Sequence, residues 1–87
     1  MTLNPNFILR EIAGQSLLVS IVDGEDSKRL LYLNGIGTDI YMHLREGLFG
    51  EALIAALLEE YDAEETALRA DVDEFLATLR SHGIVED

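Results

Sequence analysis

The stretch Leu30-Leu31-Tyr32-Leu33-Asn34-Gly35-Ile36-Gly37 separates two halves of the chain with different patterns. Its apolar first part predicts a short strand. Asn34 then suits the position before a helix, because its side-chain oxygen can accept a hydrogen bond from a backbone N–H of the first turn. Apolar runs of strand length precede this stretch and helical periodicity follows it, so the chain changes here from strands to helices.

Alternation along the predicted strand 29–33 assigns its side chains to two faces. Successive side chains of a strand point to opposite sides of a sheet. We therefore expect Leu31 and Leu33 to face the helices, and Leu30 and Tyr32 to be more exposed.

Two further strands are predicted upstream. Residues 7–12 and 17–22 are apolar runs, and Ala13-Gly14-Gln15 between them is a turn signal, so the pair predicts a β-hairpin. An exposed loop at 23–27, which contains Asp23-Gly24, then leads to the third strand.

Three helices are predicted downstream, over about 35–46, 50–61 and from 62 to Gly83. Gly47 and Gly83 suit helix ends, and Asp62 with Glu65 has the spacing of a capping box at the start of the third helix. Ile84 and Val85 form an apolar tail that should fold onto the core. Strands followed by helices predict an α+β fold, in which three helices cover an antiparallel three-stranded sheet.

Composition limits the function. The 87 residues predict a single domain over 1–87, with a flexible N-terminus at 1–6. There is no cysteine, no signal-peptide core and no apolar run long enough for a membrane span, so we expect a cytoplasmic protein without a membrane partner. The net charge is −11, and residues 46–87 hold twelve acidic residues against two basic ones, which disfavours nucleic acid as a partner.

Catalytic and metal-binding patterns are weak. Asp39, His43 and Glu46 can share one face of a helix, but this trio is typical of a solvated surface. Gly35-Ile36-Gly37 lacks the third glycine and the Lys-Ser/Thr of a phosphate loop. We therefore expect no enzyme activity, no metal and no cofactor. A free strand edge remains, to which a peptide could add as a further strand.

Several motifs, taken in order, resemble the PqqD family, also called RiPP recognition elements. They are Phe7-x-Leu9-Arg10, Tyr32-Leu33-Asn34-x-x-Gly37-x-x-Ile40-x-x-x-Leu44, Gly47, Leu53-x-x-x-Leu57-x-x-x-Tyr61-Asp62 and Asp71-Val72-x-x-Phe75-Leu76-x-x-Leu79-x-x-x-Gly83-Ile84-Val85-Glu86. The resemblance extends over 7–86. Tyr41-Met42 departs from it where the family often has Trp, and Phe49-Gly50 replaces the usual polar start of the second helix.

The resemblance implies a winged-helix-like domain that binds a peptide and performs no catalysis. Family members bind the leader segment of a ribosomally made precursor peptide as an added strand and present it to a modifying enzyme. That enzyme is a radical SAM protein in PQQ synthesis, and a cyclodehydratase or leader protease in other pathways. By position, the implied peptide-binding residues are Arg29, Leu30, Leu31, Tyr32, Leu33, Arg69, Asp71, Val72, Phe75, Leu76 and Leu79.

Two alternatives remain open from the sequence. The first is a winged-helix regulator that binds DNA through the last two helices, although the third helix carries mostly acidic residues. The second is a structural interaction domain without a peptide ligand.

Overall fold

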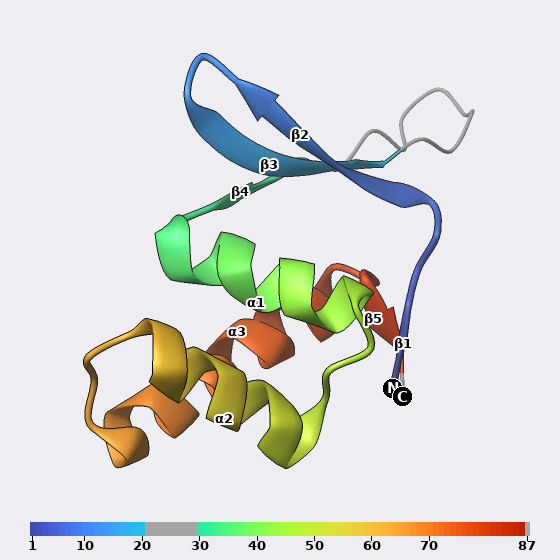
Figure 1. Ribbon diagram of the computed structural model, residues 1–87. Coiled ribbons are helices and arrows are strands. Elements are labelled where there is room, and N and C mark those ends of the chain that lie inside the picture. Colours follow the sequence, from blue (N-terminus) through green and yellow to red (C-terminus); the bar gives the residue numbers. More distant parts are fainter. Residues whose placement is uncertain (21–29, 87) are drawn as a thin grey trace.

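The computed structural model describes residues 1–20 and 30–86, and it contains a small sheet above three helices (Figure 1). The predicted loop at 23–27, the last two residues of the second predicted strand and Arg29 lie outside the described residues. In chain order the elements are β1 (Thr2–Leu3), β2 (Phe7–Ile12), β3 (Gln15–Ser20), β4 (Leu30–Leu33), α1 (Gly35–Arg45), α2 (Gly50–Glu60), α3 (Glu65–Ser81) and β5 (Val85–Glu86). This arrangement confirms the predicted α+β fold.

The main sheet is antiparallel with the order β2-β3-β4. A two-residue turn joins β2 to β3, and Ala13 and Gly14 both have positive φ angles, of 54° and 78°. Positive φ at both central positions is typical of the tight hairpin turn whose twist matches the flanking strands. Gln15, predicted as part of the turn, is already the first residue of β3 and pairs with Ile12.

The two faces of the sheet differ as the alternation predicts. Leu18 and Leu33 are buried against the helices and Leu31 is half-buried, whereas Leu30 and Tyr32 are 54% and 62% exposed. Leu17 pairs with Tyr32 and so shares the outer face, yet it is buried.

Helix α1 begins as the sequence predicts. The side-chain oxygen of Asn34 accepts a 2.7 Å hydrogen bond from the backbone N–H of Gly37. The helix ends at Arg45, and Gly47 follows with a φ of 90°, a conformation that glycine adopts without a steric penalty. Helix α2 starts after Phe49, which makes no side-chain cap, as expected from its apolar character.

Helix α3 begins at Glu65, three residues later than predicted, and the Asp62–Glu65 capping box is wrong. The N-cap is Glu64, whose carboxylate accepts from the N–H of Ala67 at 3.1 Å. The backbone N–H of Tyr61 still donates to Leu57, and that of Ala63 donates to Tyr61. These bonds place Asp62 inside a turn that leaves α2, so the next acidic side chain serves as the cap.

The N-terminal residues, for which the sequence predicts a flexible segment, include the short strand β1. Thr2 and Leu3 of β1 pair antiparallel with Glu86 and Val85 of β5, which brings the two ends of the chain together (Figure 1). Asn4 adds hydrogen bonds to the carbonyls of Ile84 and Gly83. The prediction for the C-terminal tail is confirmed, because Ile84 and Val85 are buried.

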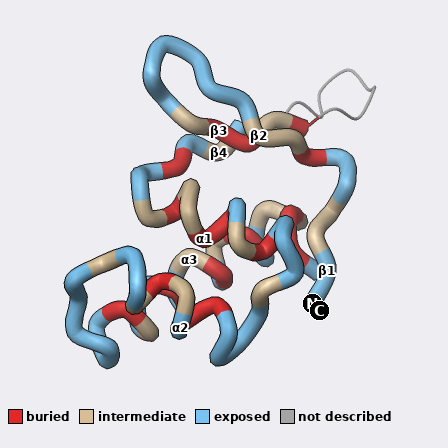
Figure 2. Tube along the Cα trace, in the orientation of Figure 1, coloured by how far each residue is buried: buried red, intermediate tan, exposed pale blue. Residues whose placement is uncertain are grey.

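The core lies where the three helices and the inner face of the sheet meet, and the buried segments of the helices face one another (Figure 2). None of the described helices is long and apolar enough to span a bilayer. The largest fully buried side chains are Leu18, Ile40, Leu53, Leu57, Leu68, Leu79 and Ile84.

Candidate peptide-binding surface

Strand β4 forms one edge of the main sheet. It pairs with β3 on one side, and no described strand pairs with its other side. An edge strand presents backbone N–H and C=O groups that an added strand can use. The exposed Leu30 and Tyr32 stand on the outer face beside this edge. The edge therefore offers backbone hydrogen bonds together with apolar contact area.

A cleft of about 250 Å³ begins where β4 ends, between the first turns of α1 and the middle of α3. We call it the α1–α3 cleft. Phe75, Ile36 and Ile40 give it apolar walls, and Asp71 and Glu74 add two carboxylates. An apolar segment with a basic residue fits such a lining. The remaining lining residues are Asn34, Gly37 and Thr78.

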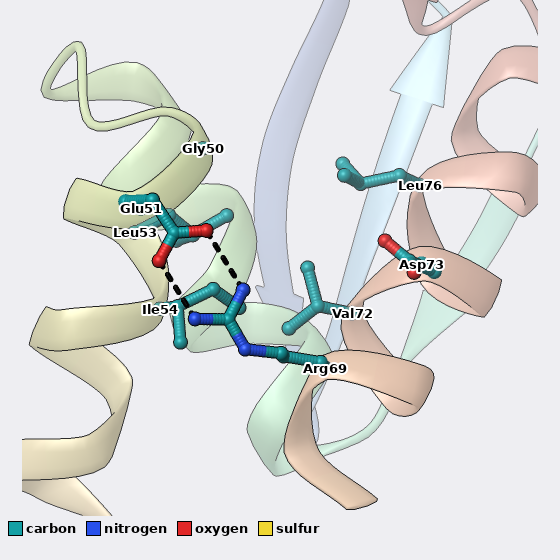
Figure 3. A pocket seen from close by; sticks show the side chains of 8 residues that line it. All are labelled: Gly50, Glu51, Leu53, Ile54, Arg69, Val72, Asp73 and Leu76. Atoms are coloured by element: carbon teal, nitrogen blue, oxygen red, sulfur yellow. Dashed lines mark hydrogen bonds and ion pairs between the residues drawn. The ribbon is translucent and has the colours of Figure 1, made fainter. Parts of the chain in front are cut away.

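Part of the predicted site lies on another face of α3. Figure 3 shows the α2–α3 cleft, of about 180 Å³, which Val72 and Leu76 line together with Leu53 and Ile54. Arg69 also lines it. The complete lining adds Gly50, Glu51 and Asp73.

Arg69 has partners within the protein. Its Nη1 and Nη2 donate to the two carboxylate oxygens of Glu51 at 2.8 and 2.7 Å (Figure 3). Its Nε donates to Glu65 at 2.9 Å. These bonds lower the pKa of the Glu51 carboxyl and raise that of the guanidinium. An acidic leader residue would have to compete with two carboxylates for this arginine.

The predicted residues thus fall into separate groups. Leu30 and Tyr32 stand at the β4 edge, Leu31 and Leu33 point inward, and Asp71 and Phe75 line the α1–α3 cleft. Leu79 is fully buried in the core, so it is closed to a ligand.

Only Asp71 and Phe75 of the α1–α3 cleft were among the predicted binding residues. The six that sequence reasoning missed are Asn34, Ile36, Gly37, Ile40, Glu74 and Thr78. A signal was present in the spacing. Asp71, Glu74 and Thr78 recur at steps of three and four, which places them on one face of a helix. The apolar periodicity of α3 predicted only the side of the helix that faces the core.

Two members of the polar trio, Asp39 and His43, link α1 to the end of α2. The side chain of His43 is largely buried, and its Nε2 lies 2.9 Å from Glu60 on α2, while the hydroxyl of Tyr61 donates to Asp39. The hydrogen bond to Glu60 raises the pKa of His43, and the bond to Asp39 raises the pKa of Tyr61 to about 12. Asp39 and His43 are therefore more than the solvated surface expected from the sequence, whereas the side chain of Glu46 is exposed. Within the described ranges no cluster of His, Asp and Glu is arranged to hold a metal ion.

The charge on α3 argues against the DNA-binding alternative. Asp71, Asp73 and Glu74 are exposed along the helix. Arg69 is already bound by two carboxylates. A recognition helix needs cations for the phosphate backbone.

Comparison with known proteins supports the resemblance seen in the sequence. The family model described as Coenzyme PQQ synthesis protein D (PqqD) matches residues 20–85. The chain belongs to the PqqD family. This PqqD-family chain also resembles a solved structure described as TbiB1 in complex with the TbiA(beta) leader peptide, with a TM-score of 0.83 and 21% sequence identity over 99% of this chain and 95% of that chain. The likeness confirms the fold. The comparison with curated proteins gave no match.

Proposed function

We propose that this PqqD-family protein is a non-catalytic adaptor that binds the leader segment of a ribosomally synthesised precursor peptide and presents it to a modifying enzyme. The leader adds as a strand to the free edge of β4, and its side chains enter the α1–α3 cleft. The observation that carries the proposal is the position of that edge: it ends at Leu33, and Asn34, which follows, already lines the cleft. Family membership and the fold shared with a protein bound to a leader peptide support it.

The lining of the cleft indicates what the leader should carry. Asp71 and Glu74 lie beside Phe75, so an apolar anchor next to a lysine or arginine would satisfy both the wall and the carboxylates. The same acidic surface would draw a basic leader toward the protein, because the chain carries a net charge of −11. The enzyme that receives the peptide is expected to be a radical SAM protein, a cyclodehydratase or a leader protease, acting in PQQ or another RiPP pathway in the cytoplasm.

The direct test is a titration of the ¹⁵N-labelled protein with leader peptides from precursor genes that neighbour its own gene. We expect amide shifts in β4, the start of α1 and the Asp71–Thr78 face of α3. Shifts confined to α2 and the second half of α1 would overturn the proposed site.

A scan of the bound leader with N-methylated residues tests the mode of binding. Every second backbone N–H of an added strand points toward its partner strand. Affinity should therefore fall at alternate positions of the leader and stay nearly unchanged at the positions between them. A uniform effect along the segment would exclude strand addition. This test alters only the ligand and leaves the protein fold intact.

A further inference from the structure

The opposite edge of the sheet carries a second cleft. It occupies about 500 Å³ beside β2 and the C-terminal half of α1, and we call it the β2–α1 cleft. Figure 1 shows the segment from β1 to β2 passing the end of α1, on the opposite side of the sheet from the link between β4 and α1. Its lining residues are Leu3, Asn4, Pro5, Phe7, Ile8, Leu9, Tyr41 and Arg45.

The β2–α1 cleft runs along a free strand edge. Three consecutive residues of β2, Phe7, Ile8 and Leu9, line it. Because consecutive side chains of a strand point to opposite faces, a cavity lined by all three lies against the edge of the strand. Among the described strands β2 pairs only with β3, so this edge has no partner. Its backbone groups are available to an added strand.

Two polar groups of α1 line the same cleft. Tyr41 is only 3% exposed, yet no described residue hydrogen-bonds to its hydroxyl. Its burial raises the pKa of this hydroxyl, and the nearby charge of Arg45 opposes that rise, so the group is a neutral donor at physiological pH. The guanidinium of Arg45 donates to the sulfur of Met42 at 3.8 Å, and no carboxylate of the described residues pairs with it. A guanidinium beside a hydroxyl donor is suited to a carboxylate.

We propose that the β2–α1 cleft is a second peptide-binding site, which takes an extended segment of a partner protein with a carboxylate side chain between apolar residues. The backbone of the segment pairs with the free edge of β2. Its carboxylate meets Arg45 and the hydroxyl of Tyr41, and its neighbours rest on Leu3, Pro5 and Ile8. A second copy of the chain is a poor occupant, because each copy carries a net charge of −11.

Such a site would give the adaptor one edge for the leader and another for a protein that acts on it. That role rests on the proposed function, whereas binding at the β2–α1 cleft does not. The proposed function and the second site can therefore fail independently. Leader binding is detected by amide shifts in β4 and α3, and binding at the second site by shifts in β2 and Tyr41.

The probe is a short soluble peptide, acetyl-Ser-Val-Glu-Val-Ser-amide, with matched peptides that have Gln or Lys at the centre. With the full ¹⁵N-labelled protein, the Glu peptide should shift the amides of Phe7 to Leu9 and the signals of Tyr41 and Arg45. The Gln peptide should bind about tenfold more weakly, since it loses the charge-assisted hydrogen bonds. The Lys peptide should instead shift the acidic helices α2 and α3.

Two variants complete the test. Arg45→Met should reduce the affinity for the Glu peptide to that for the Gln peptide. Arg10→Met, on β2 but outside the cleft lining, should leave the affinity unchanged. Equal affinities for the Glu and Gln peptides, an unchanged affinity of Arg45→Met, or shifts confined to β4 and α3 would each overturn the proposal, as would no shift at millimolar peptide.

Discussion

Replacement of Gly37 by alanine tests how closely α1 approaches α3. A Cβ at position 37 would lie 2.9 Å from the side-chain oxygen of Asn34 and 2.9 Å from Cε1 of Phe75. Carbon atoms normally pack at about 3.5–4.0 Å, so both neighbours must move. Asn34 would then lose its 2.7 Å hydrogen bond to the N–H of residue 37.

The expected change in stability follows from three contributions. Loss of the Asn34 cap costs about 1 kcal/mol, and repacking of Phe75 costs about 1–2 kcal/mol. The higher helix propensity of alanine than of glycine offsets about 1 kcal/mol of this loss. Gly37→Ala should therefore lower the free energy of unfolding by about 1–2 kcal/mol, which lowers Tm by roughly 4–16 °C in a domain of this size.

Gly35→Ala is the matched control, two residues earlier in the same helix. A Cβ at position 35 would meet nothing within 4 Å. Its substitution should raise stability by about 0.4–1 kcal/mol, because alanine reduces the freedom of the unfolded chain. Urea unfolding of both variants measures the difference. A Gly37→Ala variant as stable as Gly35→Ala would refute the close approach.

A double-mutant cycle separates the two clashes at Gly37. In a Phe75→Ala background the ring is absent, so the added methyl meets only Asn34. The cost of Gly37→Ala should then fall by about 1 kcal/mol or more. An unchanged cost would assign the whole effect to the cap.

Three further predictions concern charge and binding. The bond to Glu60 raises the pKa of His43 in the folded protein above 6.5. The stabilisation that protonated His43 gives to the folded state is therefore complete below pH 6.5, and it is lost as the pH rises through the higher pKa of the folded state. Relative to His43→Gln, the wild-type Tm should therefore fall between about pH 6 and 8, and a constant difference would contradict this. Arg69→Gln should lower Tm at low salt and much less at 1 M NaCl, where exposed ion pairs are screened; a salt-independent loss would indicate a packing role. Tyr32→Ala should weaken leader binding about two- to fivefold through a lost cross-strand contact. Ile12 on β2 is nearly as exposed as Tyr32, and Ile12→Ala should leave leader binding unchanged. Equal effects of the two substitutions in calorimetric titrations would show that Tyr32 has no special role.

Local patterns account for the parts of the fold that could be predicted. The Asn34 cap, the glycine at the end of α1 and the alternation of Leu30 to Leu33 depend on residues a few positions apart. The N-cap of α3 was missed because several acidic residues near the start of the helix could each act as the cap. The turn that follows α2 determines which of them is in the capping position.

The candidate site was predicted less completely, for a geometric reason. Helix α3 packs against two neighbours, so its apolar residues occupy a wide arc, and their periodicity does not say which neighbour each one faces. The structure separates Phe75, toward α1, from Val72 and Leu76, toward α2. The resemblance implied Arg69 as a peptide-binding residue, and only the fold brings Glu51 to it.

The sequence by itself determined the order of the three main-sheet strands and the three helices, the inward and outward sides of β4, and the family. The tertiary structure decided what depends on residues far apart in the chain. It paired Thr2 with Glu86, divided α3 between two clefts, and placed Tyr41 and Arg45 beside the edge of β2. Periodicity and capping are read within one or two turns of chain, whereas a cleft between elements exists only after they pack.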